Sequence, residues 1–264
     1  MKKWGICVRR KVVLITGGAT GMGKRTAQLL AALRFDIIFT YVTSEQRAYE
    51  LRDQLTQKYG VQVNCFQSDA SDMASCEQLM KEIELIYKGI DIFIHNAGPY
   101  VHERKKMTEY SNDEWRYIMN GNLNSFFYIA RKIVPYMREQ GWGRIITLGF
   151  DRSETSPGWV YRSAFAAAKS GLTSLTRTLA QEEAANGITV NMVCPGDITG
   201  EWKESSIQEA LSEIDPNVPV GRPGTGEDIA RVIAFLCDEK SSFITGSVIP
   251  VTGGKDVLGK LYRK

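Results

Sequence analysis

The sequence predicts a single α/β domain in which about seven parallel strands form one sheet with helices on both faces. Three observations lead to this prediction. Short apolar runs rich in β-branched residues alternate with longer segments of helical period along the chain. A length of 264 residues and a hydrophobic fraction of 43% suit one large core. No Pro/Gly/Ser-rich linker, low-complexity tract or internal repeat divides the sequence, so we expect residues 1–264 to form one domain.

Each of the first six expected strands is followed by a helical segment. The strands are expected at residues 12–16, 36–42, 61–66, 91–94, 144–148, 188–193 and 247–251. The helices are expected at residues 21–33, 45–59, 73–87, 112–139, 160–185 and 226–237, with a shorter one near 201–214. This alternation is typical of a doubly wound parallel sheet, because crossover helices cover both of its faces.

Local signals mark several helix boundaries. The pairs Ser111 with Glu114 and Thr225 with Asp228 have the spacing of a capping box. Three glycines follow expected helix ends, where a left-handed residue is favoured: Gly60, Gly89 and Gly187.

Charge and hydropathy argue against large charged partners and membranes. The 33 Lys+Arg and 30 Asp+Glu residues give a formal net charge of +3, whereas nucleic-acid or membrane-surface binding needs a concentrated basic face. The basic residues 9–11 and the basic C-terminal residues are expected to be solvated ends. Residues 1–11 lack the apolar run of a signal peptide, and no 18 uncharged apolar residues follow one another. We therefore expect no nucleic-acid partner and no membrane partner.

The cysteines and histidines indicate a reduced compartment and no metal. Five cysteines are odd in number and widely spaced, without a C-x-x-C pair: Cys7, Cys65, Cys76, Cys194 and Cys237. This usage predicts a cytoplasmic protein. The two histidines, His95 and His102, give little support for a metal site.

A glycine-rich turn follows the first expected strand. Gly17 permits a tight turn, Gly21 lets the backbone approach a pyrophosphate, and Gly23 lets the first helix lie close to the sheet. The amino end of that helix then faces the anion. An ordinary glycine turn is the alternative, but the position between first strand and first helix favours dinucleotide binding.

The end of the second expected strand indicates which dinucleotide. A carboxylate there would bind the adenosine ribose of NAD, but the sequence has none. Thr43 and Ser44, with Lys24 and Arg47 near in sequence, suit a 2′-phosphate. NADP(H) is therefore preferred and NAD(H) is the alternative; solvated helix charge is the other interpretation of Lys24 and Arg47.

Together these segments resemble the classical short-chain dehydrogenase/reductase family, and within it the 3-oxoacyl-[acyl-carrier-protein] reductase branch. The resemblance runs from Val12 to about Gly254 and implies a Rossmann fold. Its motifs are, in chain order, Thr16-Gly17-x-x-x-Gly21-x-Gly23, Ser68-Asp69, His95-Asn96-Ala97-Gly98, Asn122-Leu123, Lys169, Pro195-Gly196, Ile244-Thr245-Gly246 and Gly253-Gly254.

The resemblance also implies where the cofactor binds. The expected cofactor residues are Gly17, Thr20, Gly21, Met22, Gly23, Thr43, Ser44, Asp69, Ala70, Asn96, Ala97, Gly98, Lys169, Pro195, Gly196 and Ile198. Asp69 would accept a hydrogen bond from the adenine amino group, with a helix N-cap ahead of Met73 as the alternative. Residues 197–219 resemble the mobile substrate lid of the family.

The catalytic pattern departs from the family. Relatives use a Tyr as proton donor, a Lys four residues later, a Ser that polarises the carbonyl, and an Asn that supports a water relay. Lys169 and Asn122 match, but Phe165 stands at the Tyr position. Gly149 and Phe150 stand where Ser-Ser is usual. The reduction has therefore lost its usual acid.

Two tyrosines are candidate replacements. Tyr161, the predicted acid, precedes Lys169 by eight residues, about 12 Å along an unbroken helix against about 6 Å for Phe165. Enoyl carrier-protein reductases of the same superfamily place their Tyr seven residues before the Lys. Tyr100, after the fourth strand, is the second candidate. Either ring could instead pack at a loop edge with its hydroxyl solvated, and His95 is expected to be a hydrogen-bonded structural histidine.

These observations leave two function classes. The first is an NADP(H)-dependent oxidoreductase that interconverts a carbonyl and an alcohol, or reduces an activated double bond, on a small molecule or acyl thioester. The second is a catalytically degenerate NADP-binding sensor or assembly subunit, for which Phe165 is the signature. The resemblance implies a homodimer or homotetramer through the helices expected at 112–139 and 160–185.

Overall fold

The computed structural model describes residues 9–256 and residue 258. They form a seven-stranded, wholly parallel sheet with strand order β3-β2-β1-β4-β5-β6-β7. The strands are β1 Val12–Ile15, β2 Asp36–Tyr41, β3 Val63–Gln67, β4 Ile92–His95, β5 Gly143–Leu148, β6 Ile188–Pro195 and β7 Val248–Val251. The predicted fold class, a single α/β domain with a Rossmann-type sheet, is confirmed.

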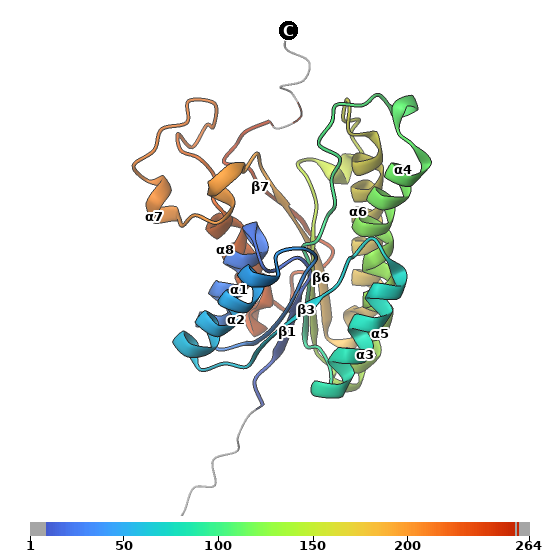
Figure 1. The fold of residues 1–264 in the computed structure, drawn as a ribbon, viewed down its shortest axis with the longest axis vertical. Helices are drawn as coiled ribbons and strands as arrows, with labels where there is room; N and C mark the ends of the chain where they lie inside the picture. Colours follow the sequence, from blue (N-terminus) through green and yellow to red (C-terminus); the bar gives the residue numbers. More distant parts are fainter. Residues whose placement is uncertain (1–8, 257, 259–264) are drawn as a thin grey trace, which may run out of the picture.

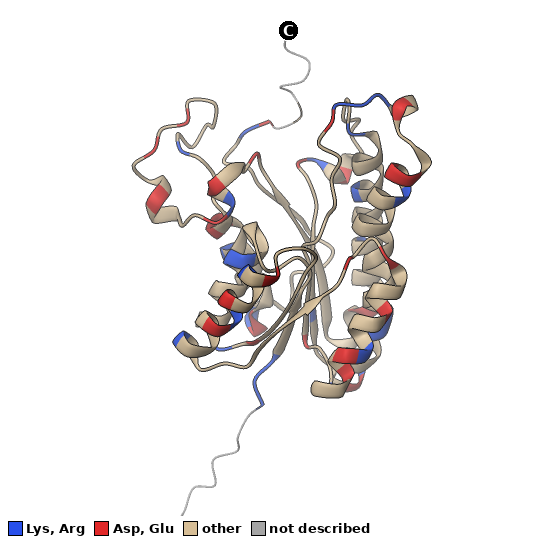
Figure 2. Cartoon of the chain, in the orientation of Figure 1, with Lys and Arg blue, Asp and Glu red and all other residues tan. Residues whose placement is uncertain are grey.

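Helices cover both faces of the sheet. They are α1 Gly21–Ala32, α2 Glu45–Tyr59, α3 Met73–Ile86, α4 Asn112–Met119, α5 Ser125–Gln140, α6 Ser163–Glu183, α7 Ile207–Ala210 and α8 Gly226–Cys237. Figure 1 shows α1, α2 and α8 on one face and α3, α4, α5 and α6 on the other. Figure 2 shows charges of both signs interspersed over the helices of the two layers.

The central strands are apolar because they are buried on both sides. In β1, Val13 and Ile15 enter the core beneath α1, α2 and α8, whereas Val12 and Leu14 enter the core beneath α3, α5 and α6. Side chains alternate along a strand, so a strand between two helical layers needs apolar residues at every position. This explains the unbroken apolar runs in the sequence.

The helix expected at 112–139 is interrupted. Between α4 and α5, residues Asn120–Asn124 form a π-helical turn. The Oγ of Ser125 donates to the backbone oxygen of Gly121 at 2.9 Å, and a Cβ on Gly121 would lie 2.1 Å from Cγ of Pro99. The chain therefore widens its helical turn where the loop after β4 passes close to it, an interaction that helical periodicity does not reveal.

Two other predicted helices have different bounds. The helix expected at 160–185 begins only at Ser163, because Tyr161 has a left-handed backbone with φ of 64°. The segment 201–214 is not one helix: it holds the 3-10 turn Gly200–Lys203 and the short helix α7, which a capping box at Ser206 restarts.

The capping predictions are largely confirmed. Both predicted capping boxes, at Ser111 and at Thr225, are present. Gly60 and Gly187 have positive φ, as predicted. The prediction for Gly89 is wrong: α3 ends in extended backbone at Tyr87. Gly89 instead makes room for the ring of Tyr136, which a Cβ would approach to 2.3 Å.

The topology brings the predicted site residues to one edge of the sheet. β1 pairs with β2 on one side and with β4 on the other, so the strand order reverses between β1 and β4. Parallel strands end at the same edge, and the reversal opens a crevice there. Segments 17–23, 43–44, 69–70, 96–98 and 195–198 follow these carboxyl ends.

Within residues 9–256 and 258, no helix is long and apolar enough to cross a bilayer. The cysteines described, Cys65, Cys76, Cys194 and Cys237, are free thiols. Cys7, the start of the chain up to residue 8 and the basic residues 260–264 lie outside the described residues.

Candidate active site

The glycine-rich turn is locked to the end of β4. Asn96 Nδ2 donates to the backbone oxygens of Thr16 at 3.0 Å and Gly17 at 2.9 Å. Thr16 Oγ1 accepts from the backbone N–H groups of Asn96 and Ala97. Gly17 has φ of 66°, and a Cβ on Gly23 would lie 2.3 Å from the oxygen of Gly17. The turn therefore requires glycine at both positions, and it fixes the start of α1 against the sheet.

The amino end of α1 holds a carboxylate. Glu204, which follows the turn Gly200–Lys203, accepts a hydrogen bond from the N–H of Gly21 at 2.9 Å. The same carboxylate pairs with Lys24 at 2.7 Å and with Arg47 at 2.6 Å. Lys24 and Arg47 thus converge on one anion. No local pattern marks Glu204 as a site residue, because it lies about 180 residues from Lys24 and meets it only in the folded chain.

The residues predicted for the adenosine half of the cofactor lie at the ends of β2 and β3. Thr43 is exposed, and Ser44 is half-buried just before α2. Asp69 Oδ1 accepts from both the N–H and the Oγ of Ser71, at 2.8 and 2.7 Å. The N-cap of α3 is Asp72, so the alternative of Asp69 as that N-cap is wrong.

The predicted catalytic lysine lies where β4, the π-helical turn and α6 meet. Lys169 is 3% exposed, and its Nζ donates to the backbone oxygen of Leu148 at 2.8 Å. Burial lowers the pKa of Lys169 from 10.5 to about 8, because the charged ammonium is poorly solvated there. A Cβ on Gly98 would lie 2.7 Å from Asn122 Oδ1 and 3.4 Å from Lys169 Nζ. The structure therefore brings Gly98, Asn122 and Lys169 together.

The π-helical turn aims the Asn122 side chain. Its Nδ2 donates to the backbone oxygens of Pro99 at 2.8 Å and Ile118 at 3.0 Å. Its Oδ1 is buried and has no hydrogen-bond partner among the residues described. A buried acceptor of this kind needs a donor from water or a ligand.

An aromatic cluster lies beside Lys169. The ring centroid of Phe165 lies 5.6 Å from Lys169 Nζ. The rings of Tyr100, Trp159 and Phe150 surround Phe165 at centroid distances of 5.3, 5.9 and 6.4 Å. The side of Lys169 at which the sequence predicts the missing acid is therefore lined by aromatic rings.

The two candidate tyrosines have different surroundings. The Arg104 guanidinium carbon lies 5.8 Å from the centroid of the Tyr161 ring. The backbone oxygen of Tyr161 accepts a hydrogen bond from the Tyr110 hydroxyl. Because Tyr161 precedes α6 in a left-handed conformation, the helical offset of about 12 Å does not describe its position. Tyr100 is in edge contact with Phe165 itself.

His95 is buried and hydrogen-bonded, as the sequence indicated. Its Nε2 lies 2.8 Å from Ser125 Oγ, whose only proton is donated to Gly121. His95 Nε2–H must then be the donor of this contact. Burial, with the Lys169 charge, lowers the pKa of His95 well below 6.5, so the ring is neutral.

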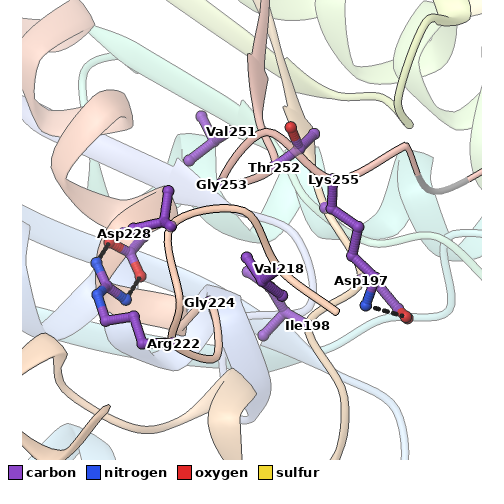
Figure 3. Close-up of a pocket in the computed structure, with 12 residues that line it drawn as sticks. Asp197, Ile198, Val218, Arg222, Gly224, Asp228, Val251, Thr252, Gly253 and Lys255 are labelled. Atoms are coloured by element: carbon purple, nitrogen blue, oxygen red, sulfur yellow. Dashed lines mark hydrogen bonds and ion pairs between the residues drawn. The ribbon is translucent and has the colours of Figure 1, made fainter. Parts of the chain in front are cut away.

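A small cavity lies beside the predicted nicotinamide residues. Its volume is about 240 Å³, and its walls include Gly196 and Ile198 after β6, Val218 of the predicted lid region, Val220 just beyond it, and Thr252 after β7. Figure 3 shows two ion pairs at its margins, Arg222 with Asp228 and Lys255 with Asp197. The end of β6 thus faces a partly open, largely apolar pocket.

These features fit a dinucleotide. The Gly17–Gly23 cradle excludes side chains, the amino end of α1 binds an anion, and Asn122 Oδ1 lacks a donor among the described residues. Within the same described ranges, no three His, Cys, Asp or Glu side chains form a group that could hold a metal ion.

Comparisons with known proteins agree with this architecture. A family model described as Enoyl-(Acyl carrier protein) reductase matches residues 17–256. The Bacillus subtilis (strain 168) protein YtkK, described as an oxidoreductase, is 45% identical over 251 residues, 94% of this chain and 97% of YtkK. The 3-oxoacyl-[acyl-carrier-protein] reductase of Aquifex aeolicus (strain VF5) is 32% identical over 249 residues, 94% of this chain and 98% of its own.

Solved structures agree as well. A Bacillus thuringiensis protein described as a 3-oxoacyl-reductase superposes with a TM-score of 0.87 at 44% identity, covering 95% of this chain and 100% of that one. A metagenomic blue fluorescent protein in complex with NADPH superposes with a TM-score of 0.80 at 30% identity, covering 92% of this chain and 97% of its own.

Proposed function

Because the chain belongs to the short-chain dehydrogenase/reductase family, we propose that it is an NADP(H)-dependent oxidoreductase acting on a small molecule or an acyl thioester. The observation that supports this most directly is the convergence of Gly98, Asn122 and Lys169 beside the glycine-rich turn. The reaction is either carbonyl–alcohol interconversion, as in the 3-oxoacyl reductases among the relatives, or reduction of an activated double bond, as the family model's description suggests.

The chain supplies binding groups for both halves of the cofactor. The turn at residues 17–23 would hold the pyrophosphate against α1, with Thr20 and Met22 beside it. Thr43 and Ser44 would face the adenosine phosphate, and Asp69 with Ala70 the adenine. The residues proposed for the nicotinamide half are Asn96, Ala97, Gly98, Lys169, Pro195, Gly196 and Ile198. When bound, the nicotinamide supplies or accepts a hydride.

Lys169 would orient and polarise the reacting groups. Its ammonium is buried, and it faces Asn122 Oδ1 across Gly98. The charged form of Lys169 would donate hydrogen bonds to the cofactor ribose and lower the barrier for protonation of the substrate. Asn122 Oδ1 would accept from an ordered water and so supply a path for the proton.

The proton donor is proposed to be a tyrosine outside the usual position. Tyr161 remains the candidate from spacing, by analogy with the displaced Tyr of related enoyl reductases. Tyr100 is supported by its edge contact with Phe165, whose ring contacts Lys169 Nζ. Changing each to Phe separates them: we expect kcat to fall by about 10²-fold or more for the donor and little for the other.

A homodimer or homotetramer is also proposed. A groove of about 450 Å³ between α5 and α6 is lined by Phe127, Leu175 and Leu179 among others, and Phe127 is 52% exposed. This is the face through which the resemblance implies association, and apolar exposure supports burial against a second copy. Sedimentation equilibrium tests it.

The competing function is a nucleotide-binding sensor or assembly subunit without turnover. The absence of a hydroxyl on Phe165, the residue that packs against Lys169, favours it. The deciding experiment measures the binding of NADPH and of NADH by calorimetry, and NADPH oxidation with ketones, quinones and enoyl thioesters. Oxidation supports the oxidoreductase, saturable binding without oxidation supports the sensor, and no binding of either dinucleotide contradicts both.

A further inference from the structure

The predicted lid region places an acidic side chain on the anion site of the glycine-rich turn. Glu204 accepts from the Gly21 N–H at 2.9 Å, from Lys24 Nζ at 2.7 Å and from an Arg47 guanidinium nitrogen at 2.6 Å. These three donors come from the turn, α1 and α2. They are a backbone N–H at a helix amino end and two cations, which is the donor set that a phosphate group selects.

The contact of Glu204 with Lys24 and Arg47 is partly buried, unlike an ordinary surface ion pair. The side chains of Glu204 and Lys24 are each 27% exposed, and Glu204 contacts both cations at once. Burial acts to raise the pKa of the Glu204 carboxyl, but hydrogen bonds from Lys24 and Gly21 outweigh it and hold that pKa below its ordinary value. The carboxylate is therefore charged at neutral pH and neutralises part of the positive potential that would attract a phosphate.

The segment around Glu204 is anchored on α1 and α8. A Cβ on Gly226, the first residue of α8, would lie 2.0 Å from the backbone oxygen of Lys203. The N–H of Ile207 donates to Glu227 at 2.8 Å, and Glu227 also pairs with Arg25 of α1. The position of Glu204 is thus coupled to the position of residues 200–207.

We propose that Glu204 acts as an internal competitor of the cofactor's 2′-phosphate: its carboxylate occupies Lys24 and Arg47, and a bound 2′-phosphate takes its place. The inference rests on the proposed dinucleotide function. Displacement costs the Glu204 ion pairs, so it reduces affinity for the phosphorylated cofactor and, because Glu204 is tied to residues 200–207, it loosens that part of the lid when the adenosine half binds.

A different role for the same carboxylate predicts the opposite result. Glu204 would then stay in place and accept hydrogen bonds from the ribose hydroxyls of an unphosphorylated nucleotide, as a carboxylate after the second strand does in NAD-binding relatives. Removing its charge would weaken the binding of unphosphorylated adenosine nucleotides. The two roles are therefore separable with adenosine fragments that lack the nicotinamide.

The test compares 2′,5′-ADP with 5′-ADP in calorimetric titrations of the full chain. Glu204→Gln removes the charge with nearly the same shape, and Glu201→Gln, an exposed neighbour on the turn Gly200–Lys203, is the matched control. We expect Glu204→Gln to bind 2′,5′-ADP about three- to tenfold more tightly. The gain for 5′-ADP should be smaller, because that ligand meets Glu204 only at the Gly21 N–H, and the control should change little for either ligand. Unchanged 2′,5′-ADP affinity, or weaker 5′-ADP binding, would overturn the proposal.

A second measurement follows the lid directly. Hydrogen exchange of residues 200–210 in the wild-type chain is expected to become faster when 2′,5′-ADP is bound and to change less with 5′-ADP. Exchange that does not change, or that slows, with 2′,5′-ADP would contradict displacement. A wild-type chain that binds neither 2′,5′-ADP nor NADPH would instead refute the proposed function, so the two failures are distinguishable.

Discussion

The two halves of the crevice differ in how closely they follow the family. At the glycine-rich turn the backbone is held in place: Asn96 donates to the oxygens of Thr16 and Gly17, and Gly23 packs against Gly17. Around Lys169, the Phe165 ring lies 5.6 Å from Nζ, at the position that the sequence comparison with the family predicts for the acid. The glycine-rich turn thus follows the family pattern, whereas the proposed catalytic residues around Lys169 depart from it.

This contrast shows that binding and chemistry can diverge within one site. Dinucleotide binding depends mainly on backbone groups and glycines, which the fold itself positions. Proton transfer depends on one hydroxyl at one place, and a single substitution removes it. The residues nearest Lys169 are therefore where experiments on this protein are most informative.

The largest effect is expected from Lys169→Met, which removes the buried ammonium while keeping an extended side chain. Turnover should fall by about 10²–10⁴-fold, because the positive charge no longer stabilises the developing negative charge. Steady-state NADPH oxidation measures the loss, and circular dichroism controls for folding. Turnover within a few-fold of wild type would show that the chemistry does not use this lysine.

Phe165→Tyr is expected to restore the usual acid and raise kcat by about tenfold to a hundredfold. The ring already lies 5.6 Å from Lys169 Nζ, so the new hydroxyl would enter the aromatic cluster beside that ammonium. Single-turnover rates compared with those of Phe165→Leu measure the gain. A loss of activity in a folded variant would mean that Tyr100 or Tyr161 already serves and that the added hydroxyl obstructs it.

The pH profile should report the buried lysine. The pKa of Lys169 is lowered to about 8 by burial, so its charged form predominates below that pH and is lost above it. If the ammonium is the working form, kcat/KM should fall about tenfold for each pH unit well above 8. The profile of Lys169→Met is the control, and a wild-type rate that stays flat to pH 10 would contradict this role.

Sequence reasoning succeeded where the fold depends on repeated local pattern. The seven strands and their parallel arrangement follow from apolar runs that must be buried on both faces, and the capping boxes at Ser111 and Thr225 predicted two helix starts. It failed where a boundary depends on a tertiary contact. The π-helical turn at Asn120–Asn124 lies where Pro99 packs against Gly121, and the hydrophobic periodicity of the sequence does not reveal that contact.

The candidate site divides in the same way. Motifs read along the chain identified Gly17, Gly23, Asn122 and Lys169, which the sheet edge then brought together. The role of Glu204 could not be predicted, because its partners are far away in sequence and it belongs to a segment of short turns. An acid in a predicted lid becomes informative only after that segment is placed on the amino end of α1.

The smallest effect is expected from Asn96→Ala, which tests the glycine-rich turn. Loss of the two hydrogen bonds from Asn96 Nδ2 leaves the oxygens of Thr16 and Gly17 without that donor, which should cost about 1–3 kcal/mol of stability. A looser turn should also weaken NADPH binding by a few-fold while leaving the pH profile of bound enzyme unchanged, because Lys169 is untouched. Thermal melting and calorimetry measure the two effects, with Asn96→Asp as a variant that keeps the shape but not the donor. If the melting temperature fell while NADPH affinity stayed at the wild-type value, the rigidity of this turn would contribute to folding alone. The function of the site would then depend on the residues around Lys169.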